Sequence, residues 1–372
     1  MPQSRKLDDN NSTSQKKTTK PNKQIRGNSI KDKLIDPAIL KKTAFVGLDV
    51  HKKTIRISAM EADGNELANW PINNTPKSVE VAFKAIPKTA IAVMESSSVW
   101  KDLYFQIRDI LGYEVILSNP RYTKMIAESK KKTDKVDAKI LADLLRGRYI
   151  VECYVPTKKS MDNRDLVRCR QMIIRTRTVY KNFIHGILLQ RRITIPRTPF
   201  STPWITKIRK IDDYRIDINL ELISGVNNAL AKLDARVRNA ARDDPDAVLL
   251  MSIPGVGPYT ALVVSSEIDG IERFTKSHKL CAYAGVVPSV KSSGDSIKYG
   301  PITHHGSNIL RWVMTECIHT HVRCAKNSSV TKFYLRLSKK RGKSKATVAA
   351  ASLLLRIIHN MLRERRKFVD VL

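Results

Sequence analysis

Four carboxylates in this sequence have the residue type and the positions that metal-dependent phosphoryl chemistry requires. Asp49 lies within the apolar run AFVGLDV, and Glu95 ends the apolar run AIAVME. Asp134 and Asp137 lie three residues apart at the start of KTDKVDAKILADLL, so they project from the same face of the helix predicted there. Carboxylate oxygens on rigid elements bind Mg²⁺ and leave coordination positions for water and phosphate. The four acids therefore predict one site for Mg²⁺ or Mn²⁺.

Each of these acids, taken alone, also has an ordinary structural explanation. A single Asp is more commonly a helix cap, a surface charge or the partner of a lysine, and Asp137 near a helix start also suits the helix dipole. Acids within apolar strands, however, are costly to bury unless a cation or a basic side chain compensates them. The joint pattern of the four acids, rather than any one of them, indicates the metal site.

The segments that must position these acids predict a mixed sheet covered by helices. Short β-rich runs occupy 44–50, 54–60, 66–72, 90–95 and 113–118. Helical spacing follows in 77–86 and 100–111, and Asn119-Pro120 begins a further helix. Alternation of this kind places helices on the faces of a sheet, and we assign it to an α/β domain over residues 43–158.

Residues 159–243 predict a hairpin of two long helices with coiled-coil character. Apolar residues recur at steps of three and four in 160–192 and again in 212–240, and the Pro-rich segment 196–204 connects the two. The stripes consist of Leu166, Cys169, Ile173, Tyr180, Phe183 and Ile187, and of Ile223, Val226, Leu230, Leu233 and Val237. Two interpretations stay open: the helices pair within one chain, or they join chains into a homodimer or tetramer.

Residues 244–372 predict a mostly α-helical domain. SIPGVGPYTA at 252–261 places a Gly-rich turn between two apolar helical segments, as in a helix-hairpin-helix element. Its backbone N–H groups would bind a phosphate, although an ordinary tight connection between helices explains the turn equally well. A Gly/Ser-rich loop is expected at 289–303, followed by helices at about 305–324 and 345–366.

The charge of the chain predicts a polyanionic partner. Sixty-seven Lys and Arg residues face 35 Asp and Glu, for a formal net charge of +32. Such an excess favours nucleic acid, although a membrane surface or a ribosomal assembly would also suit the charge alone. Residues 1–42 form a polar, basic tail that we expect to be disordered. This tail either adds affinity for nucleic acid or is a solvated terminus.

The remaining composition predicts a cytoplasmic protein. The five cysteines are odd in number and lack zinc spacing, which favours buried free thiols in a reducing compartment. The N-terminus has no apolar run of the signal-peptide type. The longest uncharged stretch is interrupted by Pro254 and Gly255, so no membrane segment is expected.

The sequence resembles the DEDD transposases of bacterial insertion sequences and the related Piv-type DNA invertases. The resemblance rests on GLDVHK, AVMES and KKTDKVDAKILADLL in the first part, and on SIPGVGPYTALVVSSEI and the segment from FTKSHKLCAYAG to LRWVMTECI in the second. It covers about residues 44–365. It implies an RNase H-like (RuvC-like) first domain and a C-terminal transposase domain.

The resemblance also implies a reaction and its residues. Asp49, Glu95, Asp134 and Asp137 would hold Mg²⁺, and Ser293 in KSSGD would attack a DNA phosphate to give a phosphoserine, with Ser292 as the adjacent rival. Donor and target DNA are the implied partners, together with a guide RNA from the same element. The motif ITHHG has His304 where many relatives carry lysine, which removes a basic side chain from that motif.

Three other functions compete with recombination. An actin-like or sugar-kinase ATPase shares the core fold but needs a Gly-rich phosphate turn after the first strand, where this chain has Val50, His51 and Lys52. A catalytically inactive nucleic-acid-binding protein suits the charge but does not explain four retained acids. A RuvC-like structure-specific nuclease explains the acids but not the second domain with its serine loop.

Overall fold

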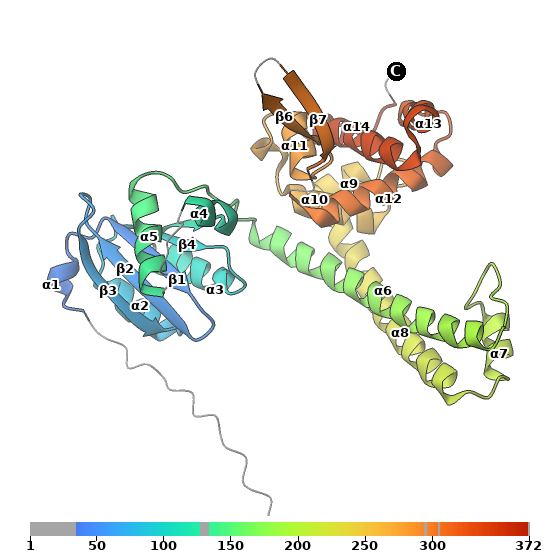
Figure 1. Cartoon of the computed structure of the whole chain (residues 1–372), viewed down its shortest axis with the longest axis horizontal. Coiled ribbons are helices and arrows are strands. Elements are labelled where there is room, and N and C mark those ends of the chain that lie inside the picture. The colour runs from blue at the N-terminus through green and yellow to red at the C-terminus, as the bar shows by residue number, and fades with distance from the viewer. Residues whose placement is uncertain (1–34, 127–133, 294–295, 304–305, 371–372) are drawn as a thin grey trace, which may run out of the picture. The chain divides into compact units, whose positions relative to one another are not determined.

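The computed structural model describes residues 35–126, 134–293, 296–303 and 306–370 (Figure 1). The chain divides into two compact units between Val155 and Pro156. The first unit contains a sheet with helices, and the second is mostly helical. None of the described helices combines the length and apolar character that crossing a membrane requires.

The first unit is built on a five-stranded mixed sheet in the order β3-β2-β1-β4-β5. Its strands are β1 (Phe45–Val50), β2 (Thr54–Met60), β3 (Glu66–Asn73), β4 (Ile91–Glu95) and β5 (Glu114–Ser118). β1, β2 and β3 pair antiparallel, whereas β4 pairs parallel with both β1 and β5. The five runs expected from the sequence are thus confirmed as strands of one mixed sheet.

The helices of this unit cover both faces of the sheet. They are α1 (Pro37–Leu40), α2 (Pro76–Lys84), α3 (Trp100–Phe105) with its π-helical continuation η1 (Gln106–Ile110), α4 (Pro120–Ile126) and α5 (Asp134–Arg146). Val46 and Leu48 of β1 belong to the larger apolar cluster, which includes Phe83 of α2 and Leu103 of α3. Val93 of β4 packs instead with α5. Alternate strand residues point to opposite faces, so α5 and the α2–α3 pair lie on opposite sides of the sheet.

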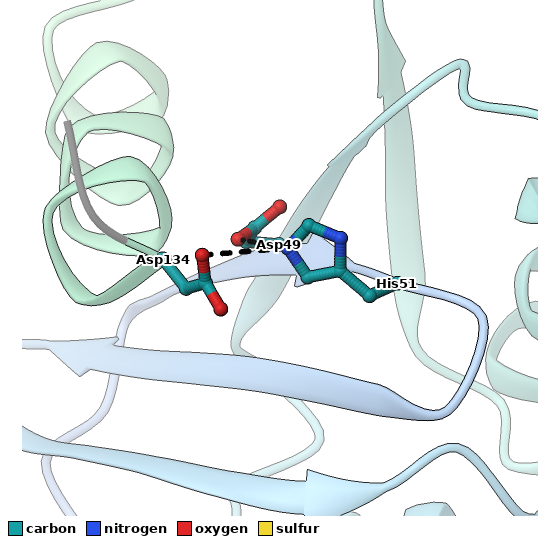
Figure 2. Close-up of side chains that lie close together, drawn as sticks. All are labelled: Asp49, His51 and Asp134. Carbon is teal, nitrogen blue, oxygen red and sulfur yellow. Dashed lines mark hydrogen bonds and ion pairs between the residues drawn. The ribbon is translucent and has the colours of Figure 1, made fainter.

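Gly47 allows α5 to lie directly on β1. A Cβ atom at Gly47 would lie 2.0 Å from the carbonyl oxygen of Ala138 and 2.8 Å from the backbone N of Ala142. Any side chain larger than hydrogen would therefore collide with the backbone of the helix. The same contact brings the start of α5 close to the carboxyl end of β1, where Asp49 lies (Figures 1 and 2).

The second unit begins with an antiparallel hairpin of two long helices, α6 (Lys158–Gln190) and α8 (Tyr214–Arg242), with α7 (Thr202–Arg209) between them (Figure 1). Arg170 Nε donates to Asp234 Oδ1 at 2.5 Å, and Arg177 donates to Asn227 at 3.1 Å. From the first bond to the second, the residue number increases on α6 and decreases on α8, so the two helices run antiparallel. The hairpin ends in its own apolar cluster, which includes Leu188, Trp204 and Leu220.

The predicted apolar stripes match α8 better than α6. Ile223, Leu230 and Val237 of α8 are buried, but on α6 Cys169 is exposed and Phe183 is 52% exposed. α6 packs against α10 near its N-terminus and against the α7 cluster near its end, so no single straight stripe faces one partner along its length. Coiled-coil packing stays a prediction.

The N-terminal end of α6 is anchored to α10 (Pro258–Ile268). Thr157, the N-cap of α6, donates through its backbone N and its hydroxyl to Asp269, both at 2.7 Å. Arg164 donates to the carbonyl oxygens of Ser266 at 2.8 Å and Glu267 at 3.1 Å, which end α10. These bonds satisfy carbonyl groups that a helix C-terminus leaves without partners.

The rest of the second unit surrounds the largest apolar cluster of the chain, which includes residues of α9, α10, α12 and α14. Its remaining elements are α9 (Pro245–Leu250), η2 (Ile271–Arg273), α11 (Ser277–Tyr283), β6 (Pro288–Ser293), β7 (Ser296–Ile302), α12 (Asn308–Cys324), α13 (Ser329–Arg341) and α14 (Lys343–Glu364). The loop expected at 289–303 is wrong, because β6 and β7 pair there as an antiparallel ribbon. The sequence also missed α13, which lies between the two helices expected at the C-terminus.

The turn between α9 and α10 packs tightly on α12. Gly255 has φ +88°, and a Cβ there would lie 2.9 Å from the backbone N of His321. The buried His321 ring bonds the carbonyl oxygen of Pro254 and the hydroxyl of Ser328, both at 2.8 Å. These contacts give the glycine a packing role, and phosphate binding by the turn stays a prediction.

All five cysteines are free, as expected. Cys281 and Cys317 are buried, and burial raises the pKa of the Cys317 thiol to about 12, so this thiol stays protonated. The expectation that the thiols are buried is wrong for Cys169 and Cys324, which are exposed.

Candidate metal site

Asp49 lies near the carboxyl end of β1 on the face that α5 covers. Gly47, two residues earlier, faces the α5 backbone, and strand periodicity places Asp49 on that same face. Its side chain is 19% exposed, so the carboxylate is largely withdrawn from water without being sealed from it. This partial access suits a group that must bind a ligand from solution.

His51 and Asp134 complete a group of three side chains at this point (Figure 2). The His51 Nε2 atom lies 3.0 Å from Asp49 Oδ2 and 3.6 Å from Asp134 Oδ1. One ligand atom from each of the three residues lies within 4.8 Å of the other two. Asp134 comes from the first residue of α5 and His51 from the turn after β1, so two elements far apart in sequence converge here.

The pairing of β1 with β4 brings Glu95 to the same edge of the sheet as Asp49. β1 and β4 are parallel, with Leu48 opposite Met94, so the next residue on each strand is Asp49 and Glu95. Residues in register on adjacent parallel strands project from the same face, and both strands end at the same edge of the sheet. Glu95 is half-buried at that edge. Among the described residues, however, the close group contains neither Glu95 nor Asp137.

Asp137 lies one turn beyond Asp134 on α5 and acts on Asp49 through its charge. Burial is the largest cause that raises the pKa of Asp49, while the neighbouring His51 lowers it. The negative charges of Asp134 and Asp137 raise it further. Three of the four predicted acids are thus electrostatically coupled.

This donor set fits a divalent cation. Two carboxylates and an imidazole within 4.8 Å offer oxygen and nitrogen ligands at bridging distance, and a bound cation would offset the repulsion that raises the pKa of Asp49. Mn²⁺ accepts both imidazole and carboxylate ligands, and Mg²⁺ prefers the oxygens. The residues that would hold the ion are Asp49 and Asp134. Glu95 lies at the end of the adjacent strand β4, and Asp137 lies one helical turn after Asp134.

His51 is the residue of this group that the sequence did not predict as part of the site. Its only signal was its position two residues after Asp49, directly beyond the strand. Its distance to Asp134 depends on how α5 folds back over β1. The sequence around His51 or Asp134 does not predict that contact.

Ser293 lies in the second unit, at the end of β6. Its backbone pairs with Ser296 of β7, and the backbone of Ser292 pairs with Ile297. The predicted nucleophile is therefore the last residue of β6, in the last pair of the ribbon. Gly294, Asp295 and His304, which the sequence also singled out, lie outside the described residues.

Comparison with known proteins matches both parts of the chain to transposases. The DEDD transposase model of IS110 elements matches residues 46–192, and the model described as "Transposase IS116/IS110/IS902 family" matches residues 247–335. The first match contains all four acids and His51, and the second contains the β6–β7 ribbon with Ser293.

Individual transposases are similar over most of their length. The transposase for insertion sequence element IS1111A of Coxiella burnetii is 23% identical, over 88% of this chain and 92% of its own length. A putative transposase of Sinorhizobium fredii, y4qE, is 26% identical over 75% of this chain and 72% of its own. The transposase for IS1328 of Yersinia enterocolitica is 23% identical over 75% and 84%. Because models of IS110-type transposases match both residues 46–192 and residues 247–335, this chain belongs to the IS110-type DEDD transposases.

Proposed function

We propose that this protein is a divalent-metal-dependent transposase that cuts and rejoins the DNA of an insertion sequence. The observation that carries the proposal is the convergence of Asp49 and Asp134, with ligand atoms within 4.8 Å, at the edge of the sheet where Glu95 ends the adjacent strand β4. The sheet order and the covering helix α5 support assignment of the first unit to the RNase H-like class. In this proposal Asp49, Glu95, Asp134 and Asp137 all contribute to holding Mg²⁺ or Mn²⁺.

The chemistry follows from the position of these acids. A bound divalent ion would neutralise charge on the DNA phosphate and favour the deprotonated form of an attacking hydroxyl. The four side chains fix the coordination geometry because β1, β4 and α5 are packed elements rather than loops. His51, hydrogen-bonded to Asp49, orients that carboxylate.

Ser293 is our proposed nucleophile. Its hydroxyl oxygen would form a bond to the DNA phosphorus, a deoxyribose oxygen would leave with a proton, and the phosphoserine would retain one phosphodiester linkage for rejoining. The support is its location as the last residue of β6, within the second family match. Ser292 lies one residue earlier in the same strand.

The proposed partners are donor and target DNA, with a guide RNA from the same element. The net charge of +32 supports polyanionic partners of both kinds. Because the proposed substrate is chromosomal DNA, we propose that the protein acts in the cytoplasm at the nucleoid. We also propose a homodimer or tetramer formed through the α6–α8 hairpin, because α6 leaves Met172 58%, Val179 63% and Phe183 52% exposed along one side.

The metal assignment is tested with an acid-to-amide pair on the full-length protein. Asp49→Asn should retain DNA binding and lose Mg²⁺-dependent strand cleavage by a factor of about 100 or more, because the metal loses a charged ligand. Asp143→Asn is the matched control, since Asp143 lies on the same helix as Asp134 but is bonded only to Arg146 in the described contacts. Equal cleavage rates for Asp49→Asn and the wild-type protein would show that the metal assignment is wrong.

The serine assignment has a separate test. A nicked suicide substrate should trap a covalent protein–DNA adduct, and peptide mass spectrometry should map it to Ser293. Ser293→Ala should abolish the adduct while Ser292→Ala retains it. An adduct on another residue, or cleavage without any adduct, would remove Ser293 from the mechanism.

The alternative functions give different products. A RuvC-like structure-specific nuclease would cut branched DNA and leave free ends, and a catalytically inactive binding protein would leave the substrate intact. Joined donor–target product in a purified reaction distinguishes the transposase from both.

A further inference from the structure

The second unit contains a pocket that the metal site and the serine ribbon do not use. It has a volume of about 710 Å³ and lies among α6, the end of α10 and the first turn of α12. Pockets of this size accommodate ligands as large as a nucleotide. Its lining is divided between a charged side and an apolar side.

A buried carboxylate organises the charged side. Glu267 is 2% exposed and accepts hydrogen bonds from Arg168 Nη2 at 2.7 Å, from the Ser307 hydroxyl at 2.9 Å and from the Tyr283 hydroxyl at 3.3 Å. Arg164 Nε lies 3.8 Å from the same carboxylate. Glu267 thereby fixes groups from three helices, so the pocket wall is preorganised before any ligand arrives.

The pocket nevertheless retains an excess of positive charge. Arg164, Arg168 and Arg175 lie on one face of α6, with Arg168 one turn and Arg175 about three turns after Arg164, against the single negative charge of Glu267. Arg175 is exposed, and no salt bridge to it is found within the described ranges. An anion entering the pocket therefore meets a guanidinium whose donors are available.

The first turn of α12 adds backbone donors at the same place. Ser307 is the N-cap of this 17-residue helix, and its hydroxyl accepts from the Leu310 N–H. The N–H groups of Asn308 and Ile309 precede the first intrahelical acceptor, as in every helix, and both residues line the pocket. Gly306, with φ +94°, lets the chain enter this turn against the carbonyl of Tyr283. Arginines and a helix N-terminus together suit a phosphate.

The apolar side carries an aromatic ring open to solvent. Trp312 is 40% exposed and Met172 is 58% exposed, and Ile309 also lines the pocket. The Trp312 ring is held edge-on by Tyr259, at 6.5 Å between ring centroids and 68° between planes. Arg170 in turn lies 4.3 Å over the Tyr259 ring. The indole thus contacts Tyr259 and keeps 40% of its surface exposed, which leaves area on which a base can stack.

We propose that this pocket binds one unpaired nucleotide, with its phosphate against Arg168, Arg175 and the start of α12, and its base on Trp312. This inference deepens the proposed function, on which it rests, by naming the form of nucleic acid that the second unit recognises. A base within a duplex has both faces stacked, so only an unpaired or extruded base can use the indole. The unpaired nucleotide comes either from a DNA strand opened for exchange or from a loop of an RNA, and both present the same phosphate and base.

The test measures binding by the full-length protein in EDTA, so that cleavage does not contribute. Fluorescence anisotropy gives the Kd for a single-stranded DNA, the RNA of the same sequence, the matching duplex and a single strand with abasic positions. Trp312→Ala should weaken binding of the single strands by about 5-fold to 100-fold, and leave the duplex and abasic strand unchanged. The strand type with the larger loss identifies the source of the nucleotide.

The phosphate part of the proposal has its own variant. Arg175→Gln should weaken binding of the single-stranded probes, the abasic strand included, and reduce the slope of log Kd against log salt by about one. Lys340→Gln is the matched control, because Lys340 is an exposed cation on α13, away from the pocket. Trp312→Phe, which keeps an aromatic face, should retain most of the affinity and also guards against an unfolded alanine variant.

Two results would overturn the pocket proposal. One is an equal loss of duplex and single-strand affinity in Trp312→Ala, and the other is an Arg175→Gln effect no larger than that of Lys340→Gln. Strand cleavage by the wild-type protein in Mg²⁺ is measured in parallel. Cleavage with no selectivity for unpaired nucleotides refutes the pocket alone, whereas selective binding without cleavage refutes the proposed function and leaves the pocket in place.

Discussion

Replacing Gly47 with alanine tests whether the contact between β1 and α5 builds the metal site. The added Cβ would lie 2.0 Å from the Ala138 carbonyl oxygen, where real Cβ atoms essentially never come closer than 3.0 Å. The obstacle is backbone at both near contacts, so no side-chain rotation relieves it. The helix must retreat from the strand by about 1 Å or more, and Asp134 and Asp137 move with it.

Two measurable losses follow from this displacement. Overpacking of this kind lowers the free energy of unfolding by about 1–3 kcal/mol, which denaturant titration of the purified protein measures. A shift of about 1 Å in a catalytic group costs about 100-fold in rate, so Mg²⁺-dependent cleavage should fall by that order while DNA binding persists.

Gly225→Ala is the control for a glycine without a spatial role. Gly225 lies in α8, and a Cβ there would meet no atom within 4 Å. Alanine in a helix interior should raise the free energy of unfolding by about 0.5–1 kcal/mol and leave cleavage unchanged. If Gly47→Ala behaved like Gly225→Ala in both assays, the close approach of α5 would not be what positions the acids.

Three further outcomes are expected. Burial raises the folded-state pKa of Asp49, so the wild-type protein loses stability as pH rises from 3.8 through the raised pKa and this carboxyl ionises. In EDTA, Asp49→Asn should therefore unfold at a higher denaturant concentration than the wild-type protein at neutral pH, and at the same concentration in acid. A lower unfolding midpoint for the variant at neutral pH would contradict this. The double variant Val179→Glu with Phe183→Glu, which alters exposed positions of α6, should lower the sedimentation mass without lowering helix content, and an unchanged mass would remove the hairpin as the oligomer contact. Glu267→Gln should lower the free energy of unfolding by about 1.5–3 kcal/mol, because its hydrogen bonds to Arg168 lose their charge, and a smaller loss in urea titration would show that Arg168 finds another partner.

Local patterns in the sequence sufficed for the strands of the sheet and for singling out its acids as candidates. The strands of the first unit are short apolar runs bounded by turns, and each acid stands near the end of such a run or near a helix start. The meeting of Asp49 with Asp134 followed from assigning both to one site. The contribution of His51 did not, because it depends on a distance across the β1–α5 contact.

Elements whose stability comes from their partners were the ones missed. The β6–β7 ribbon is polar and rich in Ser and Lys, so its sequence lacks the apolar alternation that predicts a strand. Only the pairing of β6 with β7 identifies the two strands. The stripe predicted on α6 assumed one partner along the whole helix. Instead, Arg164 near the start bonds to α10 and Leu188 near the end packs in the cluster around α7, so the buried side changes along its length.

The anchoring of α6 at one end gives its far end a long reach. The helix has 33 residues and is therefore about 50 Å long, and its bonds to Asp269 and to the end of α10 lie within about its first three turns. A tilt of only about 5° at that anchor would move the α7 end by about 4 Å, by simple leverage over this length. A ligand in the adjoining pocket would contact Arg168, four residues after Arg164, and so would bind at the anchored end of α6. A small ligand-induced shift of this end would therefore produce a large movement at the other end of the hairpin.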